Sequence, residues 1–92
     1  MGLFSLMYSV YILYSNKLNK FYIGFSANLP DRILKHNRSN KGFTSTGKPW
    51  LLIYSEIFST KREAMVREKQ LKNWKNPERL MRLIHIGSEH PD

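Results

Sequence analysis

Three short runs of apolar, β-branched and aromatic residues divide the chain into segments of different hydrophobic period. The runs cover residues 8–14 (YSVYILY), 21–25 (FYIGF) and 50–58 (WLLIYSEIF). Runs of this length and composition are typical of β-strands. Only a polar turn, NKLNK, separates the first two runs, so we expect them to form a β-hairpin.

A helix pattern follows the second run. Ser26 or Asn28 can cap a helix that has Pro30 near its first turn and extends over about residues 29–38. The next segment, NKGFTSTGKPW, contains glycine, lysine and proline, and we expect it to form a loop that leads into the third strand.

Two further helices are expected after the third run. Thr60 and Glu63 have the spacing of a capping box, which indicates a helix over about residues 61–74. Pro77 fits the first position of another helix, which we expect to end near residue 85.

The expected order of elements is therefore strand, strand, helix, strand, helix, helix. A hairpin with a third strand beside it makes a small three-stranded antiparallel sheet flanked by helices, and we expect the helices to cover one face of this α+β fold. No internal repeat or linker divides the sequence. We expect a single domain over residues 1–92, with a core at about residues 8–85 and a frayed tail at 86–92.

The chain of 92 residues carries a formal net charge of +8 and no cysteine. An excess of cations favours a polyanionic partner, and we expect nucleic acid; the alternative is a basic protein that is merely well solvated. Without cysteine, disulfides, thiol catalysis and cysteine zinc sites are excluded. The apolar start of the chain lacks a basic region and a cleavage site, and it is too short to span a bilayer. We therefore expect a cytoplasmic protein that does not contact a membrane.

Glu68 occupies an unusual position in the helix expected over residues 61–74. It falls four residues after Ala64 and three before Leu71, which places a carboxylate on the apolar stripe. A buried carboxylate is unfavourable unless it is paired or binds a metal. Glu68 is therefore a candidate metal ligand, and the alternative is a residue at the rim of the core that pairs with a neighbouring lysine or arginine.

Four other side chains are candidates for phosphate chemistry. Arg32 and His36 are four residues apart and share one face of the first helix. Tyr11 and Tyr22 lie in the two strands of the hairpin. Taken singly, the first pair also fits a solvated helix face, and each tyrosine also fits a half-buried strand position.

The joint spacing of these residues resembles the GIY-YIG nuclease family. The tripeptide SVY ends at Tyr11, ten residues follow, and the tripeptide YIG starts at Tyr22. The resemblance extends over about residues 8–84 and includes the segment REKQLKNW, as in small stand-alone bacterial members of the family. The first tripeptide is SVY instead of GIY, but its tyrosine is present.

The resemblance implies a role for each of the five residues. One tyrosine acts as the general base on the attacking water, and we favour Tyr11 over Tyr22. Arg32 stabilises charge on the phosphate in the transition state. His36 orients a water or a tyrosine hydroxyl, or protonates the leaving oxygen. Glu68 is the single protein ligand of one Mg²⁺ or Mn²⁺, which is weakly held in the absence of substrate.

Other positions are assigned to structure and to substrate binding. At Gly24, a side chain would press on the tyrosines or on the incoming backbone. Phe25 lies where some relatives carry a lysine, which removes one cation from the site. We expect phosphate contacts without base reading from six cations, namely Lys35, Lys41, Lys48, Arg67, Lys69 and Lys72.

These assignments predict a magnesium-dependent hydrolase of the GIY-YIG type, a DNA-binding endonuclease with structure-selective or weak sequence-selective cleavage, in DNA repair or recombination. DNA is favoured over RNA as the substrate, and the oligomeric state stays open. One alternative is a nucleic-acid-binding module of the same fold with little or no turnover. Another is a basic assembly factor that contacts a protein or ribosomal surface and uses none of the five residues.

Overall fold

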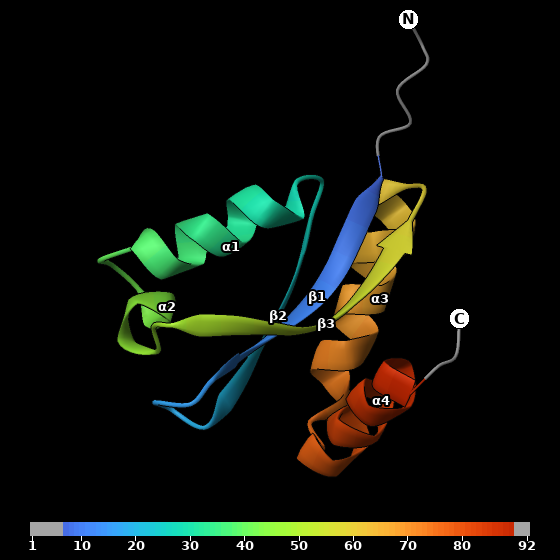
Figure 1. Ribbon diagram of the computed structural model, residues 1–92. Helices are drawn as coiled ribbons and strands as arrows, with labels where there is room; N and C mark the ends of the chain where they lie inside the picture. Colours follow the sequence, from blue (N-terminus) through green and yellow to red (C-terminus); the bar gives the residue numbers. More distant parts are fainter. Residues whose placement is uncertain (1–6, 90–92) are drawn as a thin grey trace, which may run out of the picture.

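The computed structural model describes residues 7–89, and its centre is a three-stranded antiparallel sheet. The strands are β1 (Tyr8–Ser15), β2 (Lys20–Ser26) and β3 (Trp50–Phe58), in the order β2-β1-β3 (Figure 1). The predicted hairpin and the predicted third strand are confirmed, each to within one residue at either end. The central strand β1 pairs with both of the others, so β2 and β3 are the edge strands.

Four helices complete the described part of the chain. They are α1 (Leu29–Arg38), α2 (Phe43–Thr46), α3 (Lys61–Trp74) and α4 (Pro77–Glu89). The bounds of α1 and α3 agree with the sequence prediction. The single turn of α2 lies in the segment expected to be a loop, where an amphipathic pattern is too short to be recognised.

The starts of α1 and α3 follow from side chains that cap them. The Asn28 side chain accepts a hydrogen bond from the backbone N–H of Asp31 at 3.2 Å. At α3, Thr60 and Glu63 make both hydrogen bonds of the capping box. Such a cap contributes about 1 kcal/mol to stability, so the sequence fixes the N-terminus of each helix locally.

The central strand β1 is buried on both faces of the sheet. Its residues from Val10 to Leu13 are at most 1% exposed, and side chains alternate between faces along a strand. Val10 and Ile12 therefore contact one layer, and Tyr11 and Leu13 contact the other. A strand buried on both sides needs cover on both sides.

Helices cover both faces of the sheet (Figure 1). On one face, Ala64 and Leu71 of α3 and Leu80 of α4 pack with Val10 and Ile12. On the other face, α1 packs through Leu29 and Ile33 against a second cluster, which consists of Tyr11, Leu13 and Trp50. The expectation that helices cover only one face is wrong. The nearly continuous apolar run of β1 is the sequence feature that indicates two covered faces.

The last helix is longer than predicted. It continues to Glu89 instead of ending near residue 85. Gly87 weakens a helix only modestly, and the first residue that disfavours helix in its neighbour is Pro91, two positions beyond the end. The predicted frayed tail lies partly outside the described residues, as does the apolar segment 1–6. No helix within residues 7–89 is long and apolar enough to cross a membrane.

Candidate active site

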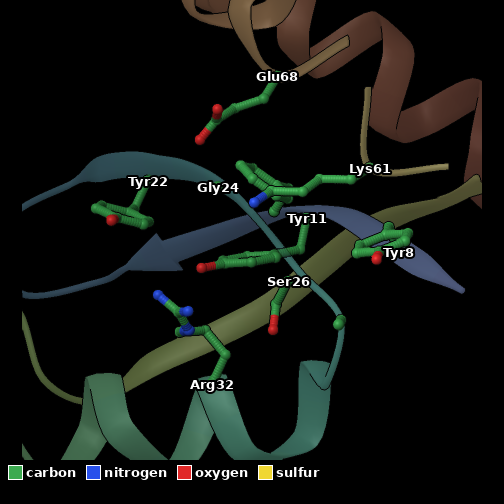
Figure 2. A pocket seen from close by; sticks show the side chains of 10 residues that line it. Tyr8, Tyr11, Tyr22, Gly24, Ser26, Arg32, Lys61 and Glu68 are labelled. Atoms are coloured by element: carbon green, nitrogen blue, oxygen red, sulfur yellow. The ribbon is translucent and has the colours of Figure 1, made fainter. Parts of the chain in front are cut away.

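A cavity of about 420 Å³ lies beside the edge strand β2 (Figure 2). Side chains from the sheet, from α1 and from α3 line it, since helices on both faces of the sheet can meet at its edge. The lining residues are Tyr8, Tyr11, Tyr22, Gly24, Phe25, Ser26, Ala27, Arg32, Lys61 and Glu68. Four of the five predicted catalytic residues are among them.

Tyr11 and Tyr22 lie side by side on the face of the hairpin that α1 covers. Their ring centroids are 6.5 Å apart and their planes differ by 24°. Tyr11 is only 1% exposed, whereas Tyr22 is half-buried. The alternation of the two strands sets this geometry, because Tyr11 is paired with Gly24 and Tyr22 precedes Gly24 by two residues.

Gly24 provides the space that the Tyr11 ring occupies. A Cβ atom at this position would lie 2.6 Å from the Tyr11 hydroxyl oxygen and 2.8 Å from Cζ. These distances are shorter than any ordinary contact, so a side chain here would displace the phenol. The requirement for glycine is therefore steric.

The fifth predicted residue, His36, lies behind the tyrosines. Its Nε2 atom is 3.0 Å from the Tyr11 hydroxyl oxygen, and its ring centroid is 4.6 Å from that of Tyr22. His36 is 7% exposed. Burial lowers the pKa of His36 from its ordinary value of 6.5, and the nearby charge of Arg32 lowers it further. At neutral pH the imidazole is therefore uncharged and can accept a proton.

The surroundings of Tyr11 raise the pKa of its phenol, whereas those of His36 lower the pKa of the imidazole. Burial raises the pKa of Tyr11 well above 10, and Tyr22 and Glu68 raise it further, while Arg32 partly opposes them. Tyr11 is thus a neutral phenol at physiological pH. It can act as a base only if it gives up its own proton in the same step, and the neighbouring imidazole is placed to take it.

Arg32 and Glu68 approach the tyrosines from opposite sides. Figure 2 shows Arg32 reaching from α1 on one side of the two rings, and Glu68 reaching from α3 on the other. The Glu68 side chain is 19% exposed, and its Oε2 atom is 3.1 Å from Nζ of Lys72. Glu68 therefore pairs with a neighbouring lysine, as one interpretation of the sequence expected, and it also lines the cavity. Its role as a metal ligand stays a prediction.

The donor set of the cavity fits a divalent cation that depends on substrate for most of its ligands. Glu68 is the only acidic side chain among the lining residues. No group of three histidine, cysteine, aspartate or glutamate residues that could hold a metal occurs within residues 7–89. Mg²⁺ in phosphate-handling sites is commonly held by one or two carboxylates, waters and substrate oxygens. The cavity lining, with a single carboxylate, does not fit a metal site in which protein side chains supply all of the ligands.

The six cations assigned to substrate binding lie outside this cavity. Lys72 pairs with Glu68, and Lys35 pairs with Asp31 at 3.4 Å. Arg67 donates two hydrogen bonds to Glu56, at 2.8 and 3.0 Å. The other three are Lys48, which donates to Asn40 at 3.3 Å, and the exposed Lys41 and Lys69.

The sequence reasoning missed three cavity residues with polar groups, namely Tyr8, Ser26 and Lys61. Ser26 is 7% exposed and accepts a hydrogen bond from the Asn28 backbone. Lys61 lines the cavity from the first turn of α3. A signal for Lys61 was available, because it precedes Glu68 by seven residues, or two helical turns, which places both on one side of the helix.

The chain is similar to known proteins in sequence and in fold. The sequence model of the GIY-YIG catalytic domain matches residues 7–82. A UPF0213 protein of Staphylococcus haemolyticus is 41% identical over 66 residues, which are 70% of this chain and 79% of that protein. A UPF0213 protein of Staphylococcus saprophyticus is 35% identical over 72 residues, or 77% of this chain and 87% of the relative.

A solved structure is similar over most of its length. The solution NMR structure of a UPF0213 protein from Bacillus halodurans has a TM-score of 0.56 and 25% sequence identity, and the match covers 91% of this chain and 89% of that one.

Proposed function

The chain belongs to the GIY-YIG family of nucleases, and on this premise we propose that it is a divalent-metal-dependent endonuclease that hydrolyses phosphodiester bonds in DNA. The observation that carries the proposal is the position of Tyr11, Tyr22, Arg32 and Glu68 around one cavity. A basic assembly factor would have no need for this grouping. The grouping supplies a base, a guanidinium and a metal-seeking carboxylate to one phosphate.

Tyr11 and His36 act together as the general base in this proposal. The attacking water gives a proton to the Tyr11 hydroxyl oxygen while the phenolic proton moves to Nε2 of His36 across the 3.0 Å hydrogen bond. A bond forms between the water oxygen and phosphorus, and the bond from phosphorus to the leaving oxygen breaks. The relay avoids a free phenolate, which the high pKa of Tyr11 disfavours.

Arg32 and Tyr22 bind the phosphate in this proposal. The exposed guanidinium of Arg32 can donate two parallel hydrogen bonds to non-bridging oxygens, where negative charge grows in the transition state. The Tyr22 hydroxyl donates a further hydrogen bond to the phosphate.

Glu68 would hold the divalent cation, Mg²⁺ or Mn²⁺, which supplies Lewis-acid stabilisation of charge on the phosphate and on the leaving oxygen. To do so, Glu68 must exchange its ion pair with Lys72 for the cation. This competition explains physically why one carboxylate would hold metal weakly until a phosphate adds its own oxygens.

The substrate preference is inferred from what surrounds the cavity. Base reading in duplex DNA requires an element that enters a groove and presents side chains to base edges. Within residues 7–89, every element packs on the small sheet, and none projects as a separate reading module. We therefore infer structure-selective or weakly sequence-selective cleavage. We further propose DNA over RNA as the substrate and a role in DNA repair or recombination, as expected from the resemblance to the nuclease family.

A cleavage assay tests the proposal. Purified protein is incubated with nicked, branched and single-stranded DNA and either Mg²⁺ or Mn²⁺. We expect cleavage that chelation abolishes and that Glu68→Ala and Arg32→Ala each slow by about 10²-fold or more. Cleavage that both variants retain would count against the proposal.

The second candidate function is a nucleic-acid-binding module of the same fold without useful turnover. It is favoured by Phe25, an apolar side chain in the cavity wall. Salt-dependent binding of every DNA form, with no metal-dependent cleavage of any, would select this alternative and reject the endonuclease.

A further inference from the structure

A second hollow lies on the outer face of α3, next to the catalytic cavity. This hollow, of about 580 Å³, is lined by Lys61, Arg62, Met65, Val66 and Lys69. Lys61 lines both hollows. In Figure 2 its side chain reaches into the catalytic cavity between α3 and Tyr11.

The geometry of α3 explains why the two hollows are neighbours. At 100° per residue, Lys61 and Glu68 lie at one border of the buried face, and Met65 and Lys69 follow on the exposed side. The segment from Lys61 to Lys69 is ~12 Å long at 1.5 Å per residue. This is roughly three and a half times the rise of ~3.4 Å per nucleotide along one strand of a duplex, so several successive phosphates can lie along it.

The cations on the outer face of α3 are available to bind phosphate, whereas the other two cations of this helix are paired with carboxylates. Arg67 is held by Glu56, and Lys72 is held by Glu68. Lys61, Arg62 and Lys69 are exposed, and none of them forms an ion pair with another described residue. Between them lie two exposed apolar side chains, Met65 at 47% and Val66 at 51%. Alternating cations and small apolar surfaces fit a strand of nucleic acid, which offers phosphates and apolar sugar or base faces.

We propose that the outer face of α3, residues Lys61, Arg62, Met65, Val66 and Lys69, binds the nucleic-acid strand that leaves the catalytic cavity. Lys61 contacts the phosphate at the boundary between the two hollows, and Arg62 and Lys69 contact the phosphates that follow. Met65 and Val66 pack against the sugars or bases between them. This inference rests on the proposed nuclease function, because that function places the strand in the cavity.

Salt-dependent binding tests this path without requiring cleavage. A fluorescein-labelled single-stranded oligonucleotide is titrated with protein in EDTA, and log Kd is plotted against log of the salt concentration. The double variant Lys61→Ala/Lys69→Ala should lower the slope by about 1.4, since each phosphate contact on a single strand contributes about 0.7.

The matched control is Lys17→Ala/Lys20→Ala. It removes the same charge from exposed positions at the tip of the hairpin, at the far end of the sheet from the start of α3 (Figure 1). Its slope should equal that of the wild-type protein. Equal losses in the two double variants would mean diffuse attraction to the whole basic surface, and unchanged slopes in both would also overturn the proposal.

A crosslink locates the strand directly. The chain contains no cysteine, so Met65→Cys introduces a single thiol on the proposed path. Met81→Cys is the control, because Met81 is 54% exposed on α4. Oligonucleotides with a disulfide-activated tether at successive phosphates should crosslink to Met65→Cys within a narrow window of tether positions, and crosslink at least tenfold less to Met81→Cys. Equal crosslinking at both sites would contradict the path.

The two proposals fail in different ways. A protein that binds along α3 but cleaves nothing rejects the endonuclease and keeps the path. A protein that cleaves normally while the α3 variants bind, crosslink and cleave like the controls rejects the path and keeps the endonuclease.

Discussion

At the scale of single residues, the proposed chemistry depends on a pair of groups that are each unsuited to act alone. The Tyr11 phenol is too weak an acid to be ionised at neutral pH, and His36 does not line the cavity. Their hydrogen bond joins a group that can face the water to a group that can hold a proton. The two opposite pKa shifts, upward for the phenol and downward for the imidazole, favour concerted transfer over stepwise ionisation.

Removal of the Tyr11 hydroxyl tests this pairing. Tyr11→Phe keeps the ring in the core and deletes the hydrogen bond to His36, so we expect the single-turnover cleavage rate to fall about 10²- to 10⁴-fold. The free energy of unfolding should change by only about 1 kcal/mol. Tyr14→Phe is the control, because Tyr14 lies on the same strand but donates to Asn19 at the hairpin end. A full rate in Tyr11→Phe would move the base function to another group.

The pH profile is the second residue-scale prediction. Protonated His36 cannot accept the Tyr11 proton, so kcat/KM should fall as the pH decreases through the pKa of His36. Because that pKa is lowered from 6.5, the midpoint of the acid limb should lie below pH 6.5. The raised pKa of Tyr11 predicts no further increase in rate up to about pH 10. A rate that climbs tenfold per pH unit between pH 7 and pH 9 would indicate a phenolate base instead.

Gly24 gives a steric prediction. In Gly24→Ala the new Cβ lies 2.6 Å from the Tyr11 hydroxyl oxygen, so the ring must shift, at a cost of about 1–3 kcal/mol in the free energy of unfolding. Cleavage should also be lost, because the hydroxyl leaves its position. The double variant Gly24→Ala/Tyr11→Phe removes the nearest clashing atom and should recover part of the stability in urea unfolding. Additive destabilisation of the two substitutions would show that the clash is not the cause.

The sequence indicated which residues line the cavity better than it indicated which side chains they contact. The spacing of Tyr11, Tyr22, Arg32 and Glu68 indicated one site because the resemblance to a nuclease family joins positions that are distant in sequence. Contacts between elements decide which cations remain free to bind phosphate. Arg67, for example, is paired with Glu56 of β3. That pair crosses from a helix to a strand, and no local pattern indicates it.

At the scale of elements, the site exists because two helices on opposite faces of the sheet meet at one edge. The position of α1 is set by Leu29 and Ile33 against the Tyr11 face, and that of α3 by Ala64 and Leu71 against the Val10 face. Periodicity and caps predicted the bounds of both helices. The faces they cover follow from the double burial of β1, which depends on tertiary packing.

The Arg67–Glu56 ion pair ties α3 to β3 and gives an element-scale prediction. Both side chains are largely buried, at 25% and 20% exposure, and Tyr54 also donates to Glu56. Arg67→Ala leaves the carboxylate without its cation, so we expect a loss of about 1–3 kcal/mol in the free energy of unfolding.

The control for this prediction is Lys35→Ala, which breaks an exposed pair with Asp31 and should cost less than about 1 kcal/mol. Urea unfolding of both variants makes the comparison. Equal losses would mean that the pair does not hold the helix in place.

At the scale of the whole molecule, a small fold surrounds a cavity of about 420 Å³ with groups from four elements. The net charge of +8 attracts polyanions at long range, but much of the positive charge near the site is already paired. Composition alone therefore indicates the class of partner. The cavity and the free cations of α3 locate where that partner would be cut and held.

The central claim is that the two phenols, the guanidinium and the Glu68 carboxylate act on a single phosphate. The most direct measurement is a crystal structure with Mn²⁺ and a DNA that carries a non-hydrolysable linkage, with the metal located by anomalous scattering. We predict one Mn²⁺ on the Glu68 carboxylate, which has left Lys72, and a DNA phosphate that contacts both this ion and Arg32. A metal or a scissile phosphate bound elsewhere, with Glu68 still paired to Lys72, would contradict the account.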